Sequence, residues 1–220
     1  MAIAIWINFV SIHKAMKNTY ILLPLFLLLM GCNASSTDVV PASFTPSAEK
    51  GLAIGTITFE GDKPVNDIYR FFYKAQAGDK KFRKNNEGKI VINGRESKEG
   101  SFNGDFNSKK SYLFVIEREP GSYAFTQYNY LDHIGSNGMV SSSKEFAIPF
   151  EIKKGEITYI GELDYKDLAE KGSPRIFVAD YFTRDLTEFK KKYPAVNWEK
   201  AINKTVKAGN DGGGIIDFRQ

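Results

Sequence analysis

The chain has 220 residues, of which 42% are hydrophobic and 14% aromatic, so it can bury the core of one globular domain. Its net charge of +4 is small, which argues against a nucleic-acid-binding protein, because those usually carry a concentrated basic face. The single cysteine, Cys32, excludes an internal disulfide and a cysteine-based metal site or redox pair.

The first predicted element is a secretory signal peptide over residues 1–31. Lys17 is followed by an apolar run from Ile21 to Met30 and then by small Gly31, which is the order of features in such peptides. The apolar run is about half of the ~20 residues that span a bilayer, so it is a poor permanent anchor. Met16 begins this pattern and is the natural start, which makes residues 1–15 either an over-long gene model or a long basic n-region.

The end of this segment, Leu29-Met30-Gly31-Cys32, resembles the lipobox of bacterial lipoproteins. The resemblance implies that the Cys32 thiol receives a diacylglycerol, that cleavage occurs before Cys32, and that the new amine is acylated. Two or three acyl chains hold a protein stably on a membrane, whereas one binds only marginally. By the sorting rule of enterobacterial lipoproteins, Asn33 in place of aspartate favours the outer membrane. The alternative is ordinary cleavage near Ala34, with a free thiol left behind or removed.

Residues 32–50 are predicted to form a flexible tether ahead of a domain over residues 51–208. Serine, threonine and proline are frequent after Cys32, the segment has no sustained periodicity, and such a composition cannot bury enough surface to order itself. As a coil the tether would span about 20–25 Å on average. Val39, Val40 and Phe44 could dock on the domain instead.

The domain is predicted to be mainly β, because short stretches of alternating apolar residues recur between glycine and proline turns. Tyr69, Phe71 and Tyr73 share one face of such a stretch, and a second pair of stretches is expected to form a hairpin around Lys153–Glu156. Pro149 cannot donate to a ladder, so its strand is expected at an edge or a bulge. The strands are expected at residues 52–60, 67–74, 89–93, 100–106, 112–118, 123–130, 146–152, 157–163 and 175–181.

Helices are predicted only near the end of the chain. Asp185 and Glu188 have the spacing of a capping box, and Pro194 would end that helix. Asn197 is expected to cap a second helix over residues 198–206. Residues 209–220, which include a glycine run, are predicted to be a flexible tail, although their last apolar residues could add a strand. Two lysine-rich runs, 80–84 and 190–192, are expected to be solvated strand edge and helix surface rather than a binding patch.

Two segments carry a resemblance to a known fold family. Residues 120–125, Pro-Gly-Ser-Tyr-Ala-Phe, resemble the turn of transthyretin-like and carboxypeptidase-regulatory-like sandwiches, although Glu119 replaces a proline of that motif. Residues 150–163 look like a hairpin of uncharacterised bacterial envelope lipoproteins. The resemblance covers roughly residues 52–181 and implies an antiparallel β-sandwich with one or two short C-terminal helices. It implies no catalytic residues.

Few residues suggest chemistry. A triad from Asp132, His133 and one of the serines at 141–143 is improbable, because an aspartate adjacent to the histidine rarely orients the imidazole from its far side. One histidine after Cys32 and no spare thiol make a transition-metal site improbable as well. A pair formed by Glu162 and Asp164 could flank a glycosidic bond, but a solvated strand face is the better interpretation.

Tyr128, Tyr130 and His133 form a weak candidate ligand site. The two tyrosines share a strand face beside the predicted His133 loop, and if exposed they would offer a stacking surface for a sugar or peptide. The alternative, which we favour, is that the tyrosines belong to the core.

The first hypothesis for function is a non-catalytic envelope lipoprotein that acts as a binding or assembly module, by β-strand addition at an open edge or by its loops. The alternative is a secreted or envelope hydrolase that uses the His133 loop, and a third hypothesis is a structural part of a larger envelope assembly. All three place the acyl chains of Cys32 in the membrane, with an envelope protein as a possible partner. They predict no cofactor, metal or nucleic acid.

Overall fold

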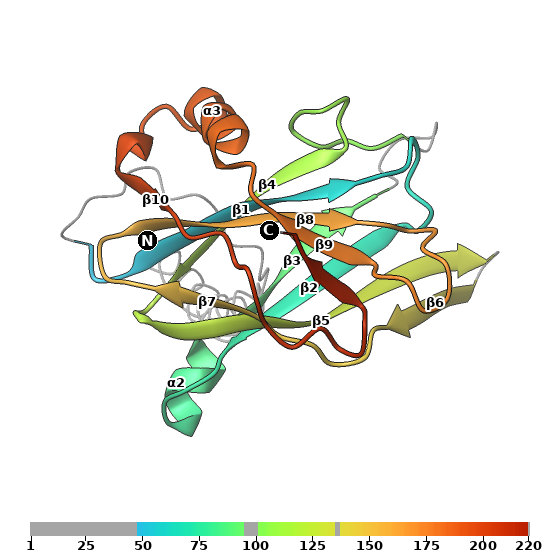
Figure 1. Cartoon of the computed structure of the whole chain (residues 1–220), viewed down its shortest axis with the longest axis horizontal. Helices are drawn as coiled ribbons and strands as arrows, with labels where there is room; N and C mark the ends of the chain where they lie inside the picture. Colours follow the sequence, from blue (N-terminus) through green and yellow to red (C-terminus); the bar gives the residue numbers. More distant parts are fainter. Residues whose placement is uncertain (1–47, 95–100, 135–136, 220) are drawn as a thin grey trace, which may run out of the picture. The chain divides into compact units, whose positions relative to one another are not determined.

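Two β-sheets face each other across a core rich in aromatic rings, as Figure 1 shows. The structure is a computed structural model and describes residues 48–94, 101–134 and 137–219. All of them lie in one compact unit, Ser36–Gln220. The predicted signal peptide, Cys32 and nearly all of the predicted tether lie outside the described residues.

Sheet A has six strands. Five follow the order β11 (Ile216–Phe218), β9 (Ile176–Ala179), β8 (Ile157–Tyr165), β1 (Gly51–Phe59) and β4 (Ser111–Arg118), and the sixth, β10 (Ala201–Asn203), also pairs with β8. Sheet B has the order β3 (Glu87–Asn93), β2 (Ile68–Ala75), β5 (Gly121–Ile134) and β6 (Asn137–Ser142), with β7 (Ile148–Ile152) on the other half of β5. The mainly β sandwich expected from the sequence is therefore confirmed. Sheet A is mixed, however, because β1 and β10 both run parallel to β8.

The core between the sheets is built from alternate residues of the strands. Tyr69, Phe71 and Tyr73 of β2 are all buried, as their spacing predicted. The ring of Tyr165 packs edge-on against Tyr128, with 5.2 Å between ring centroids, and four further rings surround these two. Edge-to-face packing of this kind adds to the free energy gained from burial alone.

A second apolar cluster lies on the other side of sheet A, under α3 (Phe182–Lys192) and the short 3₁₀ helix η1 (Trp198–Lys200). Phe189 of α3 and Trp198 of η1 pack together with 5.0 Å between ring centroids. Because α3 covers this face, β1 is buried along its whole length. The α3 helix ends before Pro194, as predicted.

The predicted hairpin around Lys153–Glu156 is wrong. The first strand, β7, pairs with β5 in sheet B, whereas the second strand, β8, lies between β1 and β9 in sheet A. The turn therefore carries the chain from one sheet to the other. The position of Pro149 was predicted correctly, because β5 is the only strand that pairs with β7 among the described residues.

The helices also differ from the prediction. The α2 helix (Lys80–Asn85) was not expected; Asp79 caps it by accepting a hydrogen bond from the Phe82 amide at 2.7 Å. The α3 helix begins at Phe182, so Asp185 is not a cap but a buried residue inside the first turn. The predicted second helix is wrong, because Ala201–Asn203 forms β10 after one turn of 3₁₀ helix.

Three strand predictions also change. Residues 101–106 form only an isolated bridge between Phe106 and Ser111 instead of a strand. Strand β6 was not predicted, since its residues were assigned to the loop that carries His133. The predicted tail contains β11, which pairs with β9 and so realises the alternative suggested by its apolar residues. No helix in the described part of the chain is long and apolar enough to cross a membrane.

Candidate functional site

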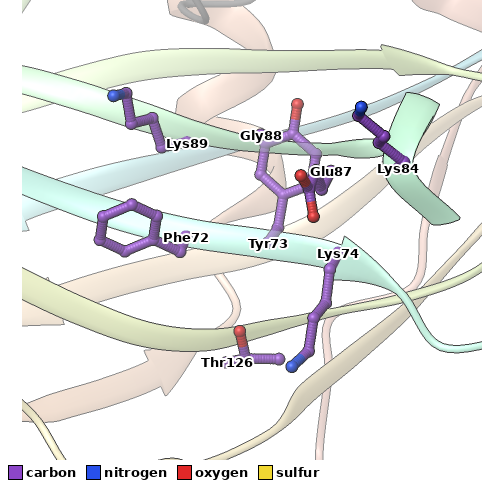
Figure 2. A pocket seen from close by; sticks show the side chains of 8 residues that line it. All are labelled: Phe72, Tyr73, Lys74, Lys84, Glu87, Gly88, Lys89 and Thr126. Atoms are coloured by element: carbon purple, nitrogen blue, oxygen red, sulfur yellow. The ribbon is translucent and has the colours of Figure 1, made fainter.

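The two outer faces of the sandwich differ in their covering. The α3 helix covers sheet A, whereas no described helix packs across the outer face of sheet B (Figure 1). Over β2 and β3 this second face is hollowed by a cavity of about 480 Å³. Its lining, drawn in Figure 2, consists of Phe72, Tyr73, Lys74, Lys84, Glu87, Gly88, Lys89 and Thr126. We call this feature the lysine hollow.

The strand register explains which side chains line the lysine hollow. In the β2–β3 pair, Phe72 lies opposite Lys89 and Lys74 opposite Glu87, so these four side chains point to the same outer face. Their neighbours along the strands, including Tyr73, point inward to the core. The short α2 helix between the two strands adds Lys84 at one end.

Gly88 lies opposite Tyr73 in the β2–β3 pair, so a side chain at this position would point toward the core. A Cβ atom at this position would lie 2.3 Å from the Tyr73 hydroxyl oxygen and 2.9 Å from a guanidinium nitrogen of Arg118. Arg118 in turn lies over the Tyr73 ring, 5.3 Å from its centroid. Any larger residue would have to displace this stacked pair, so glycine leaves room for the Tyr73 ring and the Arg118 side chain beneath the hollow.

The charges of the hollow are unbalanced. Lys74, Lys84 and Lys89 form no ion pair with any described residue, and Glu87 is the one acidic residue in the lining. Figure 2 shows the three ammonium groups spread around the hollow, with the Phe72 ring to one side of them, near Lys89. Such an arrangement attracts an anion through point charges and offers an apolar ring for its body.

The tyrosines predicted from the sequence do not lie in this hollow. The Tyr128 side chain is 5% exposed and packs against Phe71, Phe146 and Tyr165 in the core, and burial raises the pKa of its phenol. Tyr130 is half-buried against the same core. The exposed edge of Tyr128 does line a separate groove of about 650 Å³, together with Lys171, Arg175 and residues of the C-terminal glycine run. Ligand binding by these tyrosines stays a prediction.

His133 belongs to a strand instead of a loop. It lies in β5 opposite Gly138 of β6, and Asp132 lies opposite Met139. The Ser143 hydroxyl, considered above as a nucleophile, accepts a hydrogen bond from the Tyr128 amide at 3.1 Å. Cys32, the predicted lipidation site, lies outside the described residues.

The strongest grouping of charged residues lies beneath α3 and was missed by the sequence analysis. Asp185 accepts hydrogen bonds from the hydroxyls of Thr56 at 2.6 Å and Tyr159 at 2.7 Å. Glu162 accepts one from Thr58 at 2.6 Å, and Arg184 pairs with both carboxylates. We call these residues the buried carboxylate cluster.

This cluster corrects the predicted solvated face for Glu162 and Asp164. Glu162 is buried and Asp164 is half-buried, and burial raises the pKa of both carboxyl groups. The two carboxylates of the cluster, Glu162 and Asp185, are closed off from solvent and bonded to protein groups. Their hydrogen bonds and ion pairs join α3 to β1 and β8 of sheet A.

Comparison with protein-family models, curated proteins and solved structures finds no match for this chain. The likeness to transthyretin-like sandwiches therefore stays a resemblance carried by short motifs. Within the described ranges, no three residues among His, Cys, Asp and Glu are placed to hold a metal ion together.

Proposed function

We propose that this chain is an acyl-anchored lipoprotein of the bacterial envelope whose β-sandwich acts as a non-catalytic binding module for an acidic ligand. The anchor rests on the lipobox-like sequence that ends at Cys32 and on the polar segment between it and the domain. The outer membrane is the proposed location, from Asn33 after the cysteine.

One observation carries the binding role: the lysine hollow. Three ammonium groups without ion-pair partners among the described residues line the hollow together with the Phe72 ring, on the sandwich face that no described helix covers. Unpaired cations on an open face are hydrated and ready to exchange water for a carboxylate or phosphate. An acidic sugar or a similar ring-bearing anion suits the hollow, because its ring can lie on Phe72 while its charge meets Lys74 or Lys89.

The binding role can be tested by isothermal titration calorimetry or surface plasmon resonance, with polygalacturonic acid as the acidic probe and dextran as the neutral one. The Lys74→Gln/Lys89→Gln variant should bind polygalacturonic acid about tenfold or more weakly, as expected for the loss of about 1.4 kcal/mol in charge-assisted contacts. Lys63→Gln is the matched control, because Lys63 is exposed and does not line the hollow. Equal binding by both variants would overturn the assignment of the hollow.

The anchor is tested separately by the intact mass of membrane-extracted protein. The wild type should begin at Cys32 and carry acyl mass, and Cys32→Ser should lose both. A soluble product without acyl chains, cleaved elsewhere, would overturn the lipoprotein part of the proposal and leave the binding part to be judged on its own.

A further inference from the structure

The β5–β6 hairpin ends in an open sheet edge. Among the described strands, β6 pairs only with β5, and it forms the outermost strand of sheet B (Figure 1). Met139 and Val140 are consecutive, so they point to opposite faces, yet they are 56% and 60% exposed. Neither face of β6 is therefore buried in the sandwich at this point.

The hydrogen bonds to β5 show which backbone groups of β6 are free. The Ser143 amide donates to the Tyr128 carbonyl at 2.9 Å, so in the antiparallel pattern residues 139 and 141 also face β5. Gly138, Val140 and Ser142 therefore direct their N–H and C=O groups away from the sheet. Their side chains or Cα atoms are exposed as well.

Other sheet edges in the described residues carry features that oppose pairing. Lys89 and Glu87 place charge on β3, and Pro149 interrupts β7. On β4, the Asp105 carboxylate accepts a hydrogen bond from the Leu113 amide at 2.8 Å and so occupies that edge. Charges, proline and covered amides are the usual ways in which proteins prevent edge-to-edge association. Strand β6, with the sequence Asn-Gly-Met-Val-Ser-Ser, has none of them.

We propose that β6 is a self-association site, at which two copies of this chain pair their β6 strands antiparallel about a two-fold axis. If Val140 lies opposite Val140 of the second copy, Gly138 of each chain lies opposite Ser142 of the other. All three outward-facing residues then find partners, and each pair exchanges two N–H···O=C bonds. The uncharged sequence of β6 favours pairing with a second copy of this chain. A two-fold axis would bring any charged residue of the edge close to the edge of the second copy, which carries the same charge, and the two would repel each other.

The pairing would join sheet B of both copies into one continuous sheet. A two-fold axis between antiparallel edge strands runs perpendicular to the sheet, so the two lysine hollows would open on the same side. The self-association does not rest on the proposed ligand, since β6 contributes no residue to the hollow.

Disulfide crosslinking of the full chain tests the register. In a hydrogen-bonded antiparallel pair the Cα atoms are about 5.5 Å apart, within the roughly 4.4–6.8 Å that a disulfide needs. Val140→Cys should therefore give a covalent dimer under mild oxidation. Met139→Cys is the matched control: its Cα atoms would lie about 7–8 Å apart on the diagonal, and its side chain is as exposed.

We expect at least fivefold more dimer from Val140→Cys than from Met139→Cys, with the unsubstituted chain, which retains Cys32, as the background. Equal yields from the two variants, or no dimer from Val140→Cys, would overturn the proposal. A second variant, Val140→Lys, places two ammonium groups opposite each other at the axis. It should shift the sedimentation of the detergent-solubilised chain from dimer to monomer, and an unchanged dimer would equally overturn the proposal.

Discussion

The buried carboxylate cluster makes the docking of α3 depend on one side chain, Asp185. Its carboxylate is fully buried, accepts hydrogen bonds from Thr56 and Tyr159, and pairs with Arg184 at 2.7 Å. Asp185→Ala would leave the Tyr159 hydroxyl without its acceptor and the Thr56 hydroxyl with only Glu162, at 3.4 Å, and would remove one of the two carboxylates that Arg184 faces. Hydrogen bonds to a charged group contribute about 1.5–3 kcal/mol each, so the loss of those from Thr56 and Tyr159 costs about 3–6 kcal/mol. Arg184 adds little to this cost, because it is 36% exposed and keeps Glu162 as a partner.

That cost is a large share of the total, because domains of this size are stable by about 5–15 kcal/mol. At about 2–4 °C per kcal/mol, the midpoint of thermal unfolding should fall by roughly 6–24 °C. Trp198 is a natural reporter, since it is 2% exposed and packs on Phe189 of α3. Its fluorescence should show the loss of the helix as well as global unfolding.

The matched control is Glu188→Ala on the same helix. Glu188 forms a surface ion pair with Lys191, and such pairs contribute about 0–1 kcal/mol. A loss below about 1 kcal/mol for Asp185→Ala, or equal losses for the two variants, would refute the reasoning that α3 is held by buried charge.

Three further predictions concern single residues. Burial raises the pKa of Glu162 above its usual 4.5, so its contribution to stability is present below about pH 4.5 and is lost as the pH rises through the raised value. Glu162→Gln should therefore gain in stability relative to the wild type as the pH increases, which urea unfolding at several pH values measures; a constant difference would contradict it. Gly55→Ala should lower the urea midpoint, because the new Cβ would lie 2.4 Å from the Gly161 carbonyl oxygen and 2.7 Å from the Phe114 ring. The cost of such overpacking is about 1–3 kcal/mol. An unchanged midpoint would show that β1 can move away from Gly161 and Phe114 without cost, which would contradict the prediction. Burial raises the pKa of Tyr123 to about 12, so alkaline titration of the wild type should contain a late tyrosine that Tyr123→Phe removes.

The sandwich could be predicted from the sequence because apolar residues at every second position indicate a strand with one buried face. The β2 strand is the simplest example, since Tyr69, Phe71 and Tyr73 face the core. Alternation does not report which strand is the partner, however. The stretches on either side of Lys153–Glu156 have the pattern of a hairpin, yet they belong to different sheets.

The predicted second helix failed for a tertiary reason. Trp198, Ala201 and Ile202 have helical spacing, but β9 pairs only with the second half of β8, from Glu162 onward. The first half, Ile157–Tyr159, is thus left with an open edge, and Ala201–Asn203 pairs with it. Hydrogen bonds available from a distant strand outweighed the weak local preference for helix.

The candidate sites could be predicted less well. Glu162 was expected on a solvated face because a polar residue on a strand usually faces water, and only the packing of α3 places Arg184 beside it. Lys84 belongs to a run that was assigned to the surface, which is correct. Its role in the lysine hollow depends on the order of β3, β2 and β5, and no local pattern contains that order.

The entry of the chain into sheet A has a mechanical consequence. Gly51 begins β1 directly after Lys50, whose carbonyl accepts a hydrogen bond from the Gly155 amide at 3.0 Å. A pull on the amino end of the domain, such as a membrane anchor would exert, acts along a strand that is hydrogen-bonded to β4 on one side and to β8 on the other. Such a pull would load the ladders on both sides together in shear, so the domain would resist a force applied at Lys50.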